Sequence, residues 1–336
     1  MPSYIFDLFF KGSYLKGVFL DSGIVDPTGV GFSRLKSLLS EWTYFNQTQS
    51  EQVLSRIKDV DIIVVNKVVL NKDILSKTTK LKCICVTATG VDNIDVEYAQ
   101  QKGIVICNVN NYATASVAQH TFALIFSLVN RIPEYHMAVQ QGQWSGAPGF
   151  CLPLFSTFEL AGKTMGVIGR GQSGQAVANI ANVLGMKVLF SERKNIPQAK
   201  VRPGYVPFSE VIENADVISL NCPLNRETQH LLARAEFKKM KSTALLINVA
   251  RGRIIDEEAL AWALAEKEIA GAGLDVLSQE PPPKDNILLC CGLPNIIITP
   301  HVAWNTFEGT QRLIDESISN IECYLQGRPT NVVKST

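Results

Sequence analysis

The chain has 336 residues, about the length of two ordinary domains and enough to bury a substantial core. Its 32 Lys and Arg residues nearly balance 31 Asp and Glu residues, so no charge excess favours binding to nucleic acid. The hydrophobic fraction of 46% and the charged fraction of 19% are typical of globular proteins. No apolar run reaches the ~18 residues that a membrane-spanning helix needs, so we expect no membrane partner.

The N-terminal residues and the cysteines indicate neither secretion nor metal binding. Asp7, Lys11 and Lys16 interrupt the apolar start, whereas the core of a secretory signal is continuous, so we expect a cytoplasmic protein. None of the eight cysteines forms a C-x-x-C pair, and Cys83 and Cys85 alternate along an apolar stretch as small buried side chains do. We therefore expect no metal site.

The first hundred residues alternate short apolar runs with helical stretches, which is typical of parallel β-α-β units. The expected strands span 17–20, 42–45, 61–65, 83–86 and 104–109, and the expected helices span 32–39, 51–57, 72–75 and 96–102. This pattern predicts a doubly wound α/β domain. Residues 1–16 precede its first strand, and the sequence leaves open whether they form an added arm.

A second alternating series follows a long helix expected at 113–130 and a loop-rich connection at 131–154 with one short helix at most. Its expected strands span 164–168, 187–190, 217–220, 244–249, 270–275 and 295–299, and its expected helices span 175–184, 207–214, 235–239 and 257–266. A final helix at 305–324 is long enough to run back across a domain. We therefore predict two parallel α/β sheets, the first completed by the C-terminus.

A G-x-G-x-x-G motif lies between the expected strand 164–168 and the helix that follows it. Its residues are Gly169, Arg170, Gly171, Gln172, Ser173 and Gly174. The motif alone is weak evidence, but between a strand and a helix its glycines permit a tight turn, a close approach of a pyrophosphate and close helix packing. The helix N-terminus then faces the anion. The motif predicts a dinucleotide-binding loop.

The next strand leads to Glu192, about 20 residues after the motif, where an acid can bind the adenosine ribose diol. A carboxylate there repels the 2′-phosphate of NADP, so the sequence favours NAD over NADP. Arg193 and Lys194 leave the alternative open, because these cations could neutralise a 2′-phosphate.

Three polar residues follow strands of the second series, and ligands of open α/β sheets bind beyond such strand ends. Arg251, Glu280 and His301 come after the strands expected at 244–249, 270–275 and 295–299. Taken singly, Arg or Glu at such a place is commonly part of a surface ion pair. Together the three suit ketone reduction. The histidine can protonate the alkoxide left by hydride transfer, the glutamate can orient its ring, and the arginine can hold a carboxylate and polarise the carbonyl.

Five ordered stretches carry a wider resemblance, at 87–95, 112–122, 247–252, 275–282 and 299–304. From about residue 17 onward the sequence resembles the D-isomer-specific 2-hydroxyacid dehydrogenase family, and its glycerate dehydrogenase (hydroxypyruvate reductase) branch most of all. Arg251, Glu280 and His301 match the catalytic residues of that family. Ser173, Asn221 and Gln119 depart from its usual residues, which affects fine cofactor contacts but no chemical role.

The resemblance implies an architecture that spacing alone does not. A Rossmann nucleotide domain, 112–301, is inserted into a flavodoxin-like substrate domain made of 1–111 and 302–336. Two subunits pair as a homodimer through the nucleotide domains.

The resemblance also implies further site residues. Asp275 holds the nicotinamide carboxamide, Thr121 lines the nicotinamide side, and the loop Thr89-Gly90-Val91 receives the substrate carboxylate. Further cofactor contacts are implied for Cys222, Pro223, Thr228, Val249 and Ala250, and Trp304 is implied in the substrate pocket. Lys67 follows a strand near the substrate's distal end, although an exposed turn lysine is the simpler interpretation.

The leading hypothesis is therefore reduction of hydroxypyruvate to D-glycerate with NADH. A relative that acts on glyoxylate or another small 2-oxo acid is the alternative within the enzyme class. From another class, an NAD-sensing co-repressor or binding protein would share the fold. Retention of Arg251, Glu280 and His301 argues against a sensor, which needs no proton donor.

Overall fold

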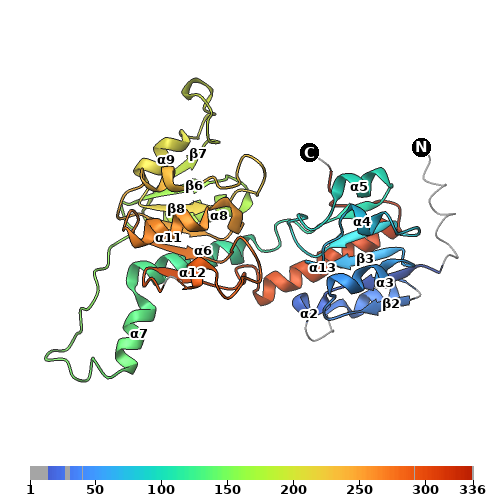
Figure 1. Cartoon of the computed structure of the whole chain (residues 1–336), viewed down its shortest axis with the longest axis horizontal. Coiled ribbons are helices and arrows are strands. Elements are labelled where there is room, and N and C mark those ends of the chain that lie inside the picture. Colours follow the sequence, from blue (N-terminus) through green and yellow to red (C-terminus); the bar gives the residue numbers. More distant parts are fainter. Residues whose placement is uncertain (1–13, 27–30, 40, 291, 335–336) are drawn as a thin grey trace. The chain divides into compact units, whose positions relative to one another are not determined.

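The structure is a computed structural model that describes residues 14–26, 31–39, 41–290 and 292–334. Its contacts divide the chain into two compact units (Figure 1). Unit 1 is the described part of Met1–Ala113 with Thr306–Thr336, and unit 2 is the described part of Thr114–Asn305. Most of the predicted N-terminal arm, residues 1–13, lies outside the described residues. The assignment of substrate and nucleotide to 1–111 with 302–336 and to 112–301 stays a prediction.

Unit 1 is built on a five-stranded parallel sheet in the order β2-β1-β3-β4-β5, the flavodoxin-like order. The strands are β1 (Lys16–Phe19), β2 (Glu41–Tyr44), β3 (Ile62–Val65), β4 (Cys83–Val86) and β5 (Val105–Cys107). Every residue of β3 and β4 is buried, as expected for the central strands of a parallel sheet covered on both faces.

The helices of unit 1 include one from the C-terminal end of the chain. They are α2 (Ser22–Val25), α3 (Val53–Ile57), α4 (Lys72–Leu75), α5 (Val96–Gln101) and α13 (Phe307–Leu325). Helix α13 packs against β4 (Figure 1), where the thiol of Cys85 lies 3.6 Å from the carbonyl oxygen of Ser317. The last helix therefore covers a sheet whose strands all lie between residues 16 and 107.

One predicted helix of unit 1 has a different form. The segment expected as a helix at 32–39 is a 3₁₀ helix, Gly31–Ser37, and a second 3₁₀ turn, Ser50–Gln52, precedes α3. Phe32 and Leu35 are the buried residues of the first segment. Their spacing of three matches the 3₁₀ period, in which residues i and i+3 share one face.

Unit 2 is built on a six-stranded parallel sheet in the order β11-β10-β9-β8-β6-β7. The strands are β6 (Thr164–Ile168), β7 (Lys187–Ser191), β8 (Val217–Leu220), β9 (Leu245–Asn248), β10 (Gly271–Leu274) and β11 (Ile296–Ile298). Val206 forms a parallel bridge with Ser191 beyond β7, which adds a rudimentary edge strand and completes the doubly wound Rossmann order. The predicted fold class, two doubly wound α/β sheets, is confirmed.

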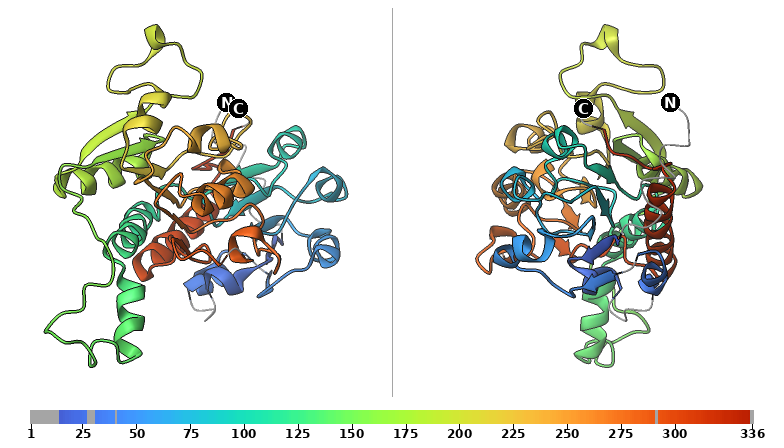
Figure 2. Two further views of the ribbon diagram at one scale, coloured as in Figure 1. Left: turned by 60° about the vertical axis from the view of Figure 1, so that its left-hand side comes forward. Right: turned by 90° about the vertical axis from the view of Figure 1, so that its right-hand side faces the viewer.

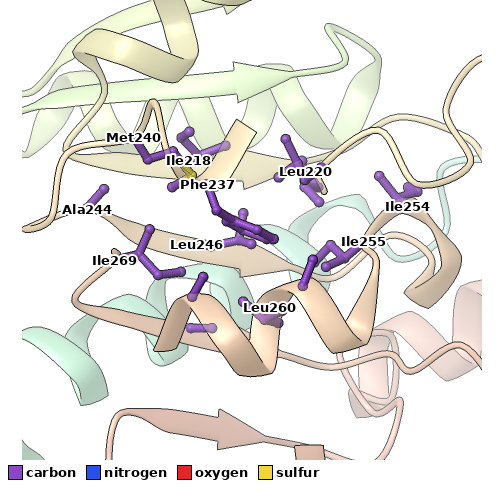
Figure 3. Close-up of a cluster of buried hydrophobic side chains, with 14 of the residues drawn as sticks. Ile218, Leu220, Phe237, Met240, Ala244, Leu246, Ile254, Ile255, Leu260 and Ile269 are labelled. Atoms are coloured by element: carbon purple, nitrogen blue, oxygen red, sulfur yellow. The ribbon is translucent and has the colours of Figure 1, made fainter. Parts of the chain in front are cut away.

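Helices cover both faces of this sheet. They are α6 (Thr114–Asn130), α7 (Ile132–Gln140), α8 (Gln172–Val183), α9 (Phe208–Asn214), α10 (Arg234–Phe237), α11 (Glu257–Ala265) and α12 (Ile287–Cys290), with 3₁₀ turns at Gln198–Lys200 and Gly252–Ile254. Phe122 and Ile125 of α6 share one apolar cluster with Val177 of α8. On the other face Phe237 packs with Ile218, Leu246 and Leu260 (Figure 3). The two clusters fix the strands whose ends carry the candidate site.

Within the described residues, no helix is long and apolar enough to cross a membrane.

We predict that Phe237→Ala destabilises unit 2 by about 3–5 kcal/mol, because the ring is fully buried and its loss leaves a cavity. Chemical denaturation followed by circular dichroism measures the change. Val183→Ala is the matched control, since Val183 is 87% exposed and its loss should change stability by less than about 0.5 kcal/mol. Equal denaturation midpoints for the two variants would contradict the prediction.

Candidate active site

The glycine motif forms a tight turn between β6 and α8. Gly169 has a φ of +102°, in the region that favours glycine, and a side chain at Gly174 would lie 1.9 Å from the carbonyl oxygen of Gly169. A side chain at Gly171 would meet nothing within 4 Å, so space is open beside the backbone there. Helix α8 begins at Gln172, and Ser173 lies in its first turn. This geometry fits a pyrophosphate at the helix N-terminus.

Other predicted cofactor residues lie in the loop after β8 and on helix α6. The hydroxyl of Thr228 donates to the carbonyl oxygen of Pro223 at 2.7 Å and so closes the turn after β8. Cys222 precedes this turn, and burial raises its thiol pKa to about 11. Thr121 is fully buried on α6, and its hydroxyl donates to the carbonyl oxygen of Val117 at 2.8 Å. It therefore presents no surface to a ligand in this structure.

The three predicted catalytic residues follow three neighbouring strands. Strand β10 pairs in parallel with β9 on one side and with β11 on the other. Arg251, Glu280 and His301 come after β9, β10 and β11 respectively, so all three follow the carboxyl ends of adjacent strands. The sheet thus brings together residues that lie up to about 50 positions apart in the sequence.

His301 and Glu280 form a direct pair. The Nδ1 atom of His301 lies 2.6 Å from Oε2 of Glu280, and the two side chains are 27% and 35% exposed. The backbone amide of Leu277 donates to the other carboxylate oxygen at 3.0 Å, which fixes the acid. Among the described residues nothing bonds to Nε2 of His301, so this atom remains available to a substrate oxygen. A carboxylate on Nδ1 stabilises the protonated ring.

Arg251 is held by the turn that follows β9. The buried Asn248 side chain donates to the carbonyl oxygen of Arg251 at 2.9 Å and accepts from the amide of Ala250 at 3.0 Å. The Arg251 guanidinium donates to the carbonyl oxygen of Ala250 at 2.8 Å. Val249 and Ala250, which precede Arg251 in the chain, are half-buried. Asn248 therefore sets the direction in which Arg251 leaves the sheet.

The buried Asp275 carboxylate anchors the loop that carries His301. Its oxygens accept from the amides of Val302 at 2.9 Å and Ala303 at 2.8 Å, and its backbone oxygen accepts from the amide of His301 at 2.8 Å. His301 has a φ of +54°, which few residues adopt without such support. The indole of Trp304 donates to the carbonyl oxygen of His301 at 3.0 Å. Asp275 thus positions the backbone that carries His301. This role is separate from the contact with the nicotinamide carboxamide that the resemblance implies for Asp275.

Two residues that the sequence analysis did not select complete this network. The Thr299 hydroxyl lies 2.5 Å from a carboxylate oxygen of Asp275, and Nε2 of His120 lies 2.9 Å from the same hydroxyl. The Thr299 hydroxyl has one proton, which it donates to the Asp275 carboxylate. The hydroxyl oxygen therefore accepts in its contact with His120, so we assign a proton to Nε2 of His120. His120 lies inside the stretch 112–122 that carries the family resemblance, but by itself it looks in the sequence like an ordinary packed helix histidine.

Glu192 has a different environment from the expected one. Its carboxylate accepts from the amides of Arg193 and Arg202 and from two guanidinium nitrogens of Arg202, the latter both at 2.7 Å. These four donors fill the acceptor sites of a carboxylate. The Arg202 pair lowers the pKa of Glu192 to about 2. Glu192 cannot bind a ribose diol unless one of these donors leaves.

The predicted carboxylate loop of unit 1 follows β4. The hydroxyl of Thr89 donates to the carbonyl oxygen of Val109 at 2.8 Å, and the Asn108 side chain donates to the carbonyl oxygen of Thr89 at 2.7 Å. These bonds tie the loop to the segment after β5. Gly90 and Val91 follow as half-buried residues.

A buried acid organises the neighbouring loop of the same sheet. The Asp21 carboxylate accepts from the amides of Asn66 at 2.8 Å, Lys67 at 2.6 Å and Val68 at 3.1 Å. Burial raises the pKa of Asp21 although these three amides oppose the rise. Lys67 is exposed at the tip of this loop, on the sheet edge that also carries Thr89.

Comparison with known proteins identifies the family. Residues 122–303 match the model of the D-isomer specific 2-hydroxyacid dehydrogenase NAD-binding domain. The chain belongs to the D-isomer specific 2-hydroxyacid dehydrogenase family. It is an oxidoreductase that acts on CH–OH donors, and its second unit contains an NAD(P)-binding domain. The predicted enzyme class is confirmed.

Individual relatives of the family differ in substrate. The chain is 39% identical to a glycerate dehydrogenase of Methylorubrum extorquens over 95% of this chain and 99% of the relative. It is 36% identical to a glyoxylate reductase of Thermococcus litoralis over 84% and 86%. Among solved structures, an acyclic imino acid reductase in complex with NADPH and D-Arg matches with a TM-score of 0.82 and 31% identity, over 95% of this chain and 100% of the other.

We predict that Thr299→Val lowers kcat about tenfold, because it removes one of the hydrogen bonds that hold the Asp275 carboxylate. Thr299→Ser keeps the hydroxyl and should restore most of the rate. Steady-state kinetics of both variants, with thermal melting to confirm that both fold, measures the effect. A valine variant with the serine variant's kcat would refute this role of the hydroxyl.

Proposed function

We propose that this oxidoreductase interconverts hydroxypyruvate and D-glycerate. The 2.6 Å contact between Nδ1 of His301 and Glu280 carries the proposal, because it supplies a proton donor beside the strand ends where a ketone would bind. The similarity to a glycerate dehydrogenase over nearly the whole of both chains supports this substrate among small 2-oxo acids. Reduction of glyoxylate is the alternative within the same chemistry.

Each of the three candidate residues has a separate task in this proposal. The dinucleotide, when bound along the glycine loop, supplies the hydride that C2 of the substrate receives. Arg251 holds the substrate carboxylate and polarises the neighbouring carbonyl with its guanidinium. His301 donates the proton from Nε2 to the developing alkoxide, and Glu280 keeps the ring oriented and stabilises its charged form before the transfer.

Further contacts with the substrate are carried over from the family resemblance. In unit 1, the backbone amides of Thr89, Gly90 and Val91 would receive the substrate carboxylate. Trp304 would contact the distal end of the substrate, and its indole is already held against the carbonyl oxygen of His301. Asp275 would accept from the nicotinamide carboxamide.

We predict that hydroxypyruvate has the highest kcat/KM among hydroxypyruvate, glyoxylate and pyruvate in a spectrophotometric assay of reduced dinucleotide. His301→Ala should lower kcat by about a thousandfold or more, because the alkoxide then lacks its proton donor. Dinucleotide affinity, measured by fluorescence titration, should stay within about threefold of the unmodified value because the imidazole is assigned to the substrate.

A matched control and a contrary result are available for this test. His136→Ala removes an exposed histidine of α7 that has no assigned role in the reaction, so its kinetics should resemble those of the unmodified enzyme. No turnover of any of the three acids, or preserved turnover in His301→Ala, would refute the proposed reaction.

The cofactor of the proposed reaction is a nicotinamide adenine dinucleotide. The sequence places NAD(H) before NADP(H) because Glu192 follows the second strand of the nucleotide-binding unit. That preference stays a prediction, since it requires the carboxylate to meet the ribose diol.

We also propose a homodimer formed through unit 2. Helix α7 and the segment that follows it project from the rest of that unit (Figure 2). This segment exposes apolar side chains, including Met137 at 58%, Trp144 at 51% and Phe150 at 91%. Exposed apolar side chains of this kind mark protein interfaces, and the family resemblance implies that a second copy of the chain covers them.

We predict that Met137→Glu combined with Phe150→Glu converts a dimer to a monomer, since each change places a charge on the exposed apolar segment. Light scattering after size-exclusion chromatography measures the mass. Ile24→Glu, an exposed apolar position of unit 1, is the control and should remain dimeric. A monomeric unmodified protein, or a dimeric double variant, would refute this interface.

A further inference from the structure

Guanidinium groups gather where the strand β7 ends. The Arg170 guanidinium lies over the ring of Phe190, 4.4 Å from its centroid, and donates to the carbonyl oxygen of Gly204 at 3.3 Å. Arg202 lies over Tyr205 at 4.1 Å, and Arg170 approaches the same ring at 5.4 Å. Both groups therefore contact one aromatic ring although they carry the same charge.

Arg193 adds a third guanidinium beside this strand end. It follows Glu192 directly, and its side chain is 69% exposed. Within the described part of the chain it pairs with Glu227 alone, at 3.9 Å, and the Glu227 side chain is 72% exposed as well. Such an exposed pair is weak, so Arg193 can turn to a ligand at little cost.

Glu192 does not counter this charge at the surface. Its side chain is only 3% exposed, and its four acceptor sites are filled by Arg202 and two backbone amides. The negative charge of Glu192 is therefore balanced by the guanidinium of Arg202. Arg170 and Arg193 remain without a buried counter-ion, and Arg202 still has Nη1 without a partner in the described part of the chain.

Lys194, the other cation expected here, points elsewhere. Its ammonium pairs with Glu236 at 2.8 Å and donates to the carbonyl oxygen of Leu231 at 3.3 Å. The available cations are therefore arginines, whose planar guanidinium matches the oxygens of a phosphate.

We propose that the adenosine-ribose subsite of this chain binds a 2′-phosphate through Arg193, Arg170 and the outer face of Arg202, so that NADP(H) serves the enzyme alongside NAD(H). In a Rossmann unit the end of the second strand faces the 2′ position of the adenosine ribose, and β7 is that strand. The yellow-green loop that follows β7 projects from the rest of unit 2 (Figure 2). The proposal rests on dinucleotide binding by unit 2 and is independent of which 2-oxo acid is reduced.

Titration calorimetry with two fragments of the cofactor tests this subsite without turnover. Adenosine 2′,5′-bisphosphate and ADP share the adenosine, and only the former carries the 2′-phosphate. We expect the 2′,5′-bisphosphate to bind at least tenfold more tightly than ADP at low salt, and the advantage to shrink as salt screens the arginines.

Two variants locate the effect. Arg193→Gln should reduce the preference for the 2′,5′-bisphosphate about fivefold or more and leave ADP binding nearly unchanged. Arg202→Leu should free the Glu192 carboxylate for the ribose diol and repel the 2′-phosphate, so the preference should reverse toward ADP. If Arg202→Leu does not fold, the Arg193→Gln variant still tests whether the subsite binds the 2′-phosphate. Lys163→Gln is the matched control, because Lys163 precedes β6 and so lies at the amino end of the parallel strands, whereas Arg193 follows the carboxyl end of β7.

Several results would overturn the proposal. These are ADP binding as tightly as the 2′,5′-bisphosphate, no binding of either fragment, or an equal change in preference in Arg193→Gln and Lys163→Gln. A preference for the 2′,5′-bisphosphate without turnover of hydroxypyruvate would uphold the subsite and refute the proposed reaction. Turnover of hydroxypyruvate with NADH, together with equal binding of the two fragments, would uphold the proposed reaction and refute the 2′-phosphate subsite.

Discussion

The buried carboxylate of Asp275 holds the candidate active site in place. It accepts from the amides of Val302 and Ala303, while its backbone oxygen accepts from the amide of His301, so one residue at the end of β10 shapes the loop that follows β11. Thr299 and His120 hold the carboxylate in turn, and His120 belongs to α6, which packs on β10 and β11. The position of the proton donor therefore depends on a strand, a helix and a loop that meet at one acid.

The sequence predicted the parts of this arrangement that follow from periodicity. Apolar strands of four to six residues alternate with helices, and a parallel sheet places the residues after those strands along one edge. Arg251, Glu280 and His301 could be selected for that reason. The inner contacts could not, because Thr299 and His120 are ordinary residues whose partners lie in other elements, and the turn that the Asn248 side chain closes has no mark of its own in the sequence. The 3₁₀ helix at Gly31–Ser37 was also missed as such, since its two buried residues fit a helix of either period.

Glu192 shows why a correct residue in a correct motif does not fix a function. Its place after the second strand matches an acid that reads the ribose diol, and the fold puts it there. What the sequence lacks is the partner: Arg202 stands ten positions further along, in a loop with no recognisable pattern, and returns to the same strand end. Glu280, by contrast, keeps an exposed side chain and uses one carboxylate oxygen for His301. The role of each acid follows from the groups that its carboxylate holds, which are a guanidinium and two amides at Glu192 and a histidine ring at Glu280.

The buried acids of the two units also differ in how their charge is balanced. At Glu192 a guanidinium lowers the pKa to about 2, so the pair contributes stability above the ordinary pKa of a glutamate, and this contribution is lost as the pH falls toward 2. At Asp21 the partners are neutral amides, and burial raises the pKa instead. The folded chain then binds the Asp21 proton more readily than the unfolded chain does, so this group lowers stability as the pH rises through its raised pKa. The buried charge of Asp21 therefore lowers the stability of unit 1. The same carboxylate holds the amides of Asn66, Lys67 and Val68 in one arrangement, at the end of the sheet that also carries Thr89.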